Sequence, residues 1–235
     1  MPRMRMRRKK NLESRLEACS DYLIPAETDD LNFSTAAEQK DYIDCAALFG
    51  REAPVYLEIG CGKGQFITEL AQRHPENNYL AVEKVGNVIV SAAERAKELR
   101  LPNVLFMKTG AEYLARFLPP QSISGIYLNF SCPFPKHSHR THRLTHRRFL
   151  AIYRTIMKPD AFLYQKTDNM HFFEFSIEEL SKSGFVLQNL SLDLHSSDFE
   201  GNIVTEYESR FVAEGKPIYR LEAYLSNPEQ GDASH

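Results

Sequence analysis

The sequence is poor in cysteine and has no long apolar run. Its four cysteines, Cys19, Cys45, Cys61 and Cys132, lie far apart and form no C-x-x-C pair. This argues against a zinc ribbon or a disulfide framework and favours a reducing compartment. No run of 18 apolar residues is present, and no apolar segment follows the basic N-terminus. We therefore expect a soluble, cytoplasmic protein without a membrane span or a membrane partner.

The chain also lacks a large excess of charge of either sign. It has 29 Lys and Arg against 31 Asp and Glu, a formal net charge of −2, so nucleic-acid binding has to be sought in local clusters. Residues 1–10 hold six Lys or Arg, and residues 136–148 hold five together with four of the eight His. The first cluster is either a solvated tail or a phosphate-binding arm. For the second we favour phosphate contacts over a merely solvated surface.

No metal site is expected in the histidine-rich cluster. His142 and His146 are four residues apart, a spacing that can place two ligands on one helix face. No cysteine pair or acidic residue lies nearby to complete a coordination shell.

With 235 residues, 43% of them apolar, the chain is long enough for one large domain with its own core. From residue 55 onward, apolar runs alternate with segments of helical period. The predicted strands are 55–59, 79–83, 103–108, 123–129, 161–166, 185–192 and 218–225. The predicted helices are 65–73, 88–99, 111–117, 144–157 and 171–182.

This alternation predicts an α/β fold of the Rossmann-like kind, a mostly parallel sheet with helices on both faces. The last two strands have no segment of helical period between them, so we expect them to form an antiparallel end of the sheet. Residues 1–50 are interpreted as a basic arm with lead-in helices, 51–226 as the main domain, and 227–235 as a tail.

One glycine-rich stretch combines a strand, a loop and a helix. Gly60, Gly62 and Gly64 follow the apolar strand 55–59 and precede the helix 65–73, an arrangement that presents backbone amides to a ligand. The dinucleotide fingerprint fails, because its sixth position is not glycine. Glu58 precedes the glycines, and Glu83 ends the next strand, where a carboxylate can take both hydroxyls of a ribose. A plain tight turn is the alternative.

A second loop, residues 129–136, should lie beside the glycine loop, across the crevice where the strand order reverses. Its two prolines, Pro133 and Pro135, stiffen it. It loosely resembles the proline-aromatic loop that clamps a planar base in amino-methyltransferases. Alternatively, it is a rigid turn that packs Phe130 and Phe134 into the core.

Polar residues of the C-terminal third complete the set of candidates. Asp168 follows the strand 161–166 and points to the same crevice. In the polar stretch 193–208, Glu206 or Glu208 could accept the two donors on the Watson–Crick edge of guanine while Tyr207 offers a stacking face. Equally, Thr205 could cap a helix with Glu208 completing a capping box, which is a purely structural role.

Taken together, the sequence resembles the bacterial tRNA (guanine-N7-)-methyltransferases, which are class I S-adenosylmethionine-dependent enzymes, over nearly its whole length. The matching segments are MRMR at 4–7, EIGCGKGQF at 58–66, NFS at 129–131, PK at 135–136, KTDN at 166–169, LDLH at 192–195 and NIVTEYE at 202–208. The last four are quite specific to this family, whereas the glycine loop is not. The resemblance implies methyl transfer from S-adenosylmethionine to N7 of a guanine in the tRNA variable loop.

The resemblance also implies roles for particular residues. Cofactor contacts fall on Glu58 and Glu83, and tRNA contacts on Lys136, Asp168 and Thr205 through Glu208. Two aspartates that the family usually has fall on Gly110 and Cys132 in this chain, which places these two positions at the cofactor and Cys132 at the catalytic site. The family's tryptophan falls on Phe134, and its Lys/Arg-rich run after Lys136 is thinned by histidine, serine and threonine.

The chemistry accommodates the change at Cys132. Guanine N7 has a lone pair and no proton, so methylation needs alignment and not a general base. Asp168 or Glu208 could stabilise the positive charge that passes to the purine. Cys132 is not expected to act as a nucleophile, since N7 chemistry offers it no carbon to attack.

Three functions are compatible with these observations. We expect a tRNA (guanine-N7-)-methyltransferase; a tRNA-binding protein whose methyltransferase fold has lost turnover is the alternative. A small-molecule methyltransferase is disfavoured by the basic clusters. No protein partner is implied, and the chain could be a monomer or a homodimer.

Overall fold

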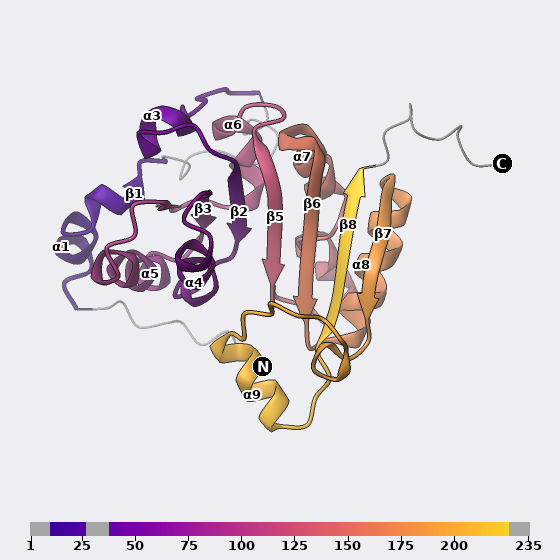
Figure 1. Ribbon diagram of the computed structural model, residues 1–235. Coiled ribbons are helices and arrows are strands. Elements are labelled where there is room, and N and C mark those ends of the chain that lie inside the picture. The colour runs from indigo at the N-terminus through magenta and orange to yellow at the C-terminus, as the bar shows by residue number, and fades with distance from the viewer. Residues whose placement is uncertain (1–9, 27–37, 226–235) are drawn as a thin grey trace.

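The computed structural model describes residues 10–26 and 38–225 (Figure 1). Most of the basic arm and the C-terminal tail therefore lie outside the described residues. The strands are β1 Leu23–Ile24, β2 Val55–Ile59, β3 Asn78–Val82, β4 Val104–Met107, β5 Ile123–Asn129, β6 Met157–Thr167, β7 Phe185–Ser191 and β8 Tyr219–Leu225. The α-helices are α1 Leu12–Glu17, α3 Cys45–Phe49, α4 Gln65–Arg73, α5 Gly86–Glu98, α6 Leu114–Phe117, α7 Arg147–Ile156, α8 Met170–Lys182 and α9 Glu206–Ala213. Short 3₁₀ turns occur at Ser20–Tyr22, Ala111–Tyr113, His137–His142 and Leu194–Ser196.

The eight strands form one sheet in the order β1-β4-β3-β2-β5-β6-β8-β7. Strands β1 to β6 pair in parallel, whereas β8 pairs antiparallel with both β6 and β7. The predicted parallel sheet with an antiparallel end is therefore confirmed. Because β2 lies between β3 and β5, the direction of chain progression reverses at β2, and the loops after β2 and β5 open onto the same crevice.

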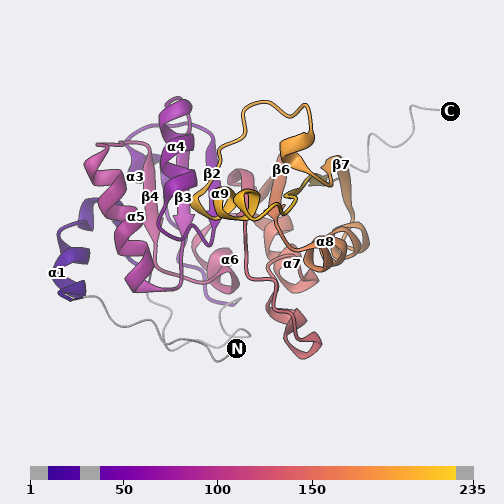
Figure 2. The same cartoon turned by 90° about the horizontal axis from the view of Figure 1, so that it is seen from below.

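Helices cover both faces of the sheet, as predicted (Figure 2). On one face, α4 and α5 bury Phe66, Ile67 and Ile89 against the strands, and α1 packs against α5. On the other face, α7 and α8 bury Phe149, Tyr153 and Leu180. Burying each helix stripe against the sheet removes apolar surface from water, which holds the two layers together.

Two elements were absent from the predicted strands and helices, although the possible capping box at Thr205 and Glu208 had indicated the start of one of them. The strand β1, in the lead-in region, pairs with β4 and forms one edge of the sheet. The helix α9 lies between β7 and β8, where the absence of a helical period had suggested no helix. In Figures 1 and 2 it lies across the carboxyl ends of the central strands. Among residues 10–26 and 38–225, no helix is long and apolar enough to cross a membrane.

The close packing of α4 on α5 depends on a glycine. Gly64 has a φ of +78°, and a Cβ there would lie 2.7 Å from the Cβ of Ala92 on α5. Gly60 has a similar φ of +80° but no atom within 4 Å of such a Cβ. A side chain at either position would strain the backbone, but only a side chain at position 64 would also overlap with a neighbouring atom.

We expect Gly60→Ala to cost about 1–2 kcal/mol through backbone strain alone. Gly64→Ala should cost about 2–4 kcal/mol, because overpacking adds to the same strain. Urea unfolding monitored by circular dichroism measures both. Equal losses for the two variants would contradict the role of Gly64 in helix packing.

Candidate functional site

The glycine loop after β2 is open on the side that faces the crevice. Gly60, Gly62 and Gly64 all have positive φ, and nothing lies within 4 Å of a Cβ built on Gly60 or Gly62. The loop leads into the N-terminus of α4, where unpaired amides favour an anionic or polar ligand. A ligand can therefore approach the backbone of the first two glycines closely.

Glu83 follows β3 and is tied to the glycine loop. Its Oε2 accepts from the Gly62 amide at 3.3 Å, and its Oε1 accepts from the Val85 amide at 3.0 Å. Burial raises the pKa of this half-buried carboxyl group, and the backbone amides oppose that shift. The predicted pairing of the glycine loop with the second acid is present, and it orients a carboxylate at the end of β3.

Glu58, the last residue but one of β2, is a deeply buried acid next to the glycine loop. It is 2% exposed, and its Oε1 accepts from the Asn129 side chain at 3.0 Å. Burial raises its pKa to about 7, although Asn129 and the charge of Lys166 lower it in part. Because Asn129 ends β5, this contact joins the two loops that border the crevice.

Three buried polar atoms near the carboxyl ends of β2, β4 and β5 have no hydrogen-bond partner in the described part of the chain. They are Oε2 of Glu58 in β2, Oγ1 of Thr109 after β4 and Oγ of Ser131 after β5. Unsatisfied buried polar atoms are costly, so their clustering along one edge indicates a ligand site. With the open glycine cradle and the Glu83 carboxylate, this edge fits S-adenosylmethionine, which carries a ribose, an adenine and two cationic groups.

The loop after β5 is strained. Phe130 and Phe134 have φ values of 49° and 42°, a conformation that costs roughly 1–3 kcal/mol for a residue other than glycine. Arg143 holds the loop by donating to the carbonyl oxygens of Pro133 at 2.8 Å and Phe134 at 3.2 Å. Neither phenylalanine enters the core as the rigid-turn alternative required, since both are only half-buried. Phe130 instead packs against Phe211 of α9.

Cys132 and Lys136 project from this loop. Both are exposed, and Lys136 starts a surface segment, residues 136–142, that is exposed throughout. Further along the basic cluster, the Arg147 guanidinium forms an ion pair with Glu179 at 2.7 Å, which connects α7 to α8. Arg147 is exposed as well, but its charge is already paired within the fold.

Asp168 lies at the carboxyl end of β6, beside the loop after β5. It is half-buried, and its carboxylate forms no hydrogen bond or ion pair with any residue that the structure describes. A carboxylate with unused acceptors at this edge can bind a donor group or stabilise developing positive charge.

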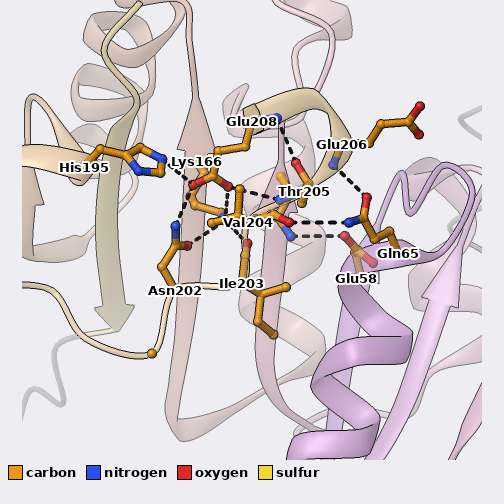
Figure 3. A network of polar contacts seen from close by, with 12 residues as sticks. Glu58, Gln65, Lys166, His195, Asn202, Ile203, Val204, Thr205, Glu206 and Glu208 are labelled. Atoms are coloured by element: carbon orange, nitrogen blue, oxygen red, sulfur yellow. Dashed lines mark hydrogen bonds and ion pairs between the residues drawn. The ribbon is translucent and has the colours of Figure 1, made fainter. Parts of the chain in front are cut away.

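Thr205 and Glu208 form the predicted capping box of α9. The Thr205 hydroxyl accepts a hydrogen bond from the Glu208 amide at 3.1 Å, and the Glu208 carboxylate accepts one from the Thr205 amide. The Glu208 carboxylate is fully buried and also receives Lys166 Nζ at 2.7 Å, His195 Nε2 at 2.9 Å and Asn202 Nδ2 at 2.6 Å (Figure 3). In this structure Glu208 therefore has no acceptor left for a base, and the structural alternative holds for this pair.

Glu206 and Tyr207, in contrast, face outward. Both side chains are exposed, with Tyr207 at 57%. The Glu206 amide donates to Gln65 Oε1 at 2.6 Å (Figure 3). The Glu206 carboxylate lies 3.4 Å from Lys63 Nζ. These contacts join the start of α9 to the glycine loop and α4.

Sequence reasoning assigned no role to Lys166, although the KTDN motif contains it. Its Nζ donates to Glu208, to Asn202 Oδ1 at 3.0 Å and to the carbonyl oxygen of Ile203 at 2.8 Å. Burial lowers the pKa of Lys166, and Glu208 opposes this shift. A lysine at the end of a buried strand is the one signal that could have predicted an acidic partner.

Gly110 lies after β4, where it is buried in an extended conformation with a φ of −97°. The aspartate that the resemblance implied at this position is therefore absent, although the backbone conformation would accept any side chain. The predicted cofactor residues thus lie at the carboxyl ends of the strands β2, β3, β4 and β5.

Comparisons with known proteins show the family to which the chain belongs. A family model described as "Putative methyltransferase" matches residues 52–221. The chain is 43% identical over 227 residues to a tRNA (guanine-N(7)-)-methyltransferase of Geobacillus thermodenitrificans, covering 97% of this chain and 100% of that protein. It is 46% identical over 182 residues to the protein of that name from Halalkalibacterium halodurans, covering 77% of this chain and 83% of the other.

The fold is similar to that of a SAM-dependent methyltransferase from Aquifex aeolicus, with a TM-score of 0.53 and 15% identity over 84% of this chain and 100% of that one. The sheet order, the glycine loop and the two acids define a class I methyltransferase. Within that class, the chain belongs to the tRNA (guanine-N(7)-)-methyltransferase family.

The raised pKa of Glu58 predicts pH-dependent binding of a cationic cofactor. Below pH of about 7 the free protein holds Glu58 protonated, whereas a cationic ligand requires the carboxylate. Affinity for S-adenosylmethionine should therefore rise with pH between about 5.5 and 7.5, by up to about tenfold per unit below the pKa. Calorimetric titration at several pH values measures this rise.

A Glu58→Gln variant is the matched control, because it keeps the shape of the side chain and cannot ionise. Its weaker affinity should change much less with pH. Parallel pH profiles for the two proteins would contradict the assignment to Glu58.

The buried pair of Lys166 and Glu208 predicts strong coupling. Lys166→Met leaves Glu208 buried without its lysine and should cost about 3–5 kcal/mol of stability. A Lys166→Met/Glu208→Leu double variant should lose less than the sum of the two single variants. Urea unfolding of the four proteins measures the coupling; strictly additive losses would contradict it.

Proposed function

We propose that this protein transfers a methyl group from S-adenosylmethionine to N7 of a guanine in the variable loop of tRNA. The observation that carries the proposal is the shared edge of the sheet. There, the cofactor loop with Glu58 and Glu83 lies beside Asp168 and the outward-facing start of α9. Membership of a family whose relatives are named for this reaction supports the same conclusion.

The proposed RNA contacts fall on exposed or unpaired groups near this edge. Lys136 and the exposed segment 136–142 would contact phosphates, since lysine and arginine bind RNA largely through its backbone. Glu206 offers acceptors for the guanine edge and Tyr207 a stacking face. Thr205 and Glu208 would contribute by holding these two residues at the N-terminus of α9.

The reaction requires alignment and charge stabilisation. S-adenosylmethionine supplies an electrophilic methyl group, and the N7 lone pair forms the new N–C bond as the S–C bond breaks, so no proton moves. Positive charge passes to the purine, where the unpaired Asp168 carboxylate can stabilise it. Glu208 cannot share this task while it is bound to Lys166 and His195. Cys132 lies in the strained loop and needs no chemical role of its own.

The proposal also bears on location and assembly. A tRNA substrate implies a cytoplasmic protein, and nothing in the proposed reaction requires a protein partner. Whether the chain acts as a monomer or a homodimer does not affect the assignment of the site.

Methyl transfer to a tRNA transcript that lacks modifications tests the proposal. The full chain, labelled S-adenosylmethionine and the transcript should yield labelled N7-methylguanosine after digestion to nucleosides. A transcript with adenosine in place of the variable-loop guanine should stay unlabelled. Asp168→Asn should lower kcat/KM by on the order of 10²-fold, because it removes charge stabilisation in the transition state.

A Cys132→Asp variant separates the alternatives. Labelling by both the natural chain and the variant supports the proposal. Labelling by the variant alone would mean that the natural chain is a tRNA-binding protein without turnover. Silence in both would overturn the proposed function.

A further inference from the structure

A carboxylate in the loop after β4 occupies the place of a missing side chain. A Cβ built on Gly110 would lie 2.3 Å from Oε2 and 2.9 Å from Oε1 of Glu112. The backbone at Gly110 is extended, with a φ of −97° and a ψ of 159°, so its conformation does not require glycine. The Glu112 side chain therefore fills the volume that a side chain at position 110 would enter.

Glu112 is also held beside the end of the neighbouring strand. Its Oε1 lies 2.5 Å from Nζ of Lys84, the residue that follows Glu83, and its side chain is only 18% exposed. In the same loop, the buried hydroxyl of Thr109 has no hydrogen-bond partner among the described residues. The end of β4 therefore offers two groups that can accept hydrogen bonds, one of them a carboxylate.

The order of the strands determines which part of the cofactor reaches this loop. The reacting methyl group has to face the crevice between β2 and β5, where the substrate lies. Glu83, which suits the ribose hydroxyls, ends β3, the next strand outward. The base, on the far side of the ribose from the sulfur, is then directed to the end of β4.

Adenine presents an exocyclic amine, which is a hydrogen-bond donor that matches a carboxylate acceptor. We propose that Glu112 recognises the adenine of the cofactor in this chain, with the Thr109 hydroxyl as a second hydrogen-bonding group. Glu112 thereby supplies the acidic group that Gly110 lacks. This inference rests on the proposed use of S-adenosylmethionine.

Calorimetric titration with two stable ligands tests the proposal. S-adenosylhomocysteine carries the exocyclic amine, and S-inosylhomocysteine carries an oxo group in its place. The natural chain should prefer the adenine ligand. Glu112→Ala should lose on the order of tenfold in affinity for that ligand and little for the inosine ligand, so that the preference disappears.

A double variant and a control complete the experiment. In Gly110→Asp/Glu112→Ala, the new aspartate enters the volume that Glu112 vacates, and the preference for adenine should return. Glu174→Ala, which removes an exposed glutamate of α8, should leave the preference unchanged. The ratio of the two affinities does not depend on the fraction of protein that is folded.

The outcomes separate the inference from the proposed function. An unchanged preference in Glu112→Ala, or its failure to return in the double variant, would overturn the role of Glu112 while leaving the cofactor assignment intact. Failure of the natural chain to bind either ligand would overturn both.

Discussion

The buried ion pair between Lys166 and Glu208 is the interaction on which the proposed substrate side of the site depends. It joins the end of β6 to the first turn of α9, with the Glu208 side chain fully buried and the Lys166 side chain 7% exposed. Removing two charges from water is expensive, and it is tolerated here because His195, Asn202 and the backbone of Ile203 complete the hydrogen bonds of the pair. Because Glu208 points into the protein from the first turn of α9, its neighbours Glu206 and Tyr207 point outward.

The same segment connects to the cofactor side through Gln65. Contacts from Gln65 to the Glu206 amide and to the Val204 carbonyl oxygen place the start of α9 against the helix that follows the glycine loop. A second contact, the hydrogen bond from the Asn129 side chain to Glu58, connects β2 and β5. The proposed cofactor and substrate residues are thus joined by short polar contacts, which suits a reaction whose main requirement is alignment.

Local patterns in the sequence were sufficient to predict the central sheet, the helices on its faces and the glycine loop with its two acids. The helix α9 was not among the predicted helices because it has no apolar stripe. Among its residues only Glu208 is buried, and the capping box at its start was the one signal of a helix. The network around Glu208 could not be predicted, since its partners come from positions 166, 195 and 202. Contacts of that kind depend on the tertiary fold. For the same reason, sequence alone did not indicate that Glu112 lies over Gly110.

A crystal structure of the chain with S-adenosylhomocysteine tests the central claim, that the carboxyl edge of the sheet is a cofactor site joined to α9, most directly. We expect the ribose at Glu83, the sulfur facing the loop after β5, and the Lys166–Glu208 pair intact beneath the outward-facing Tyr207. A ligand bound away from the ends of β2, β3 and β4, or a broken pair with α9 displaced, would contradict it.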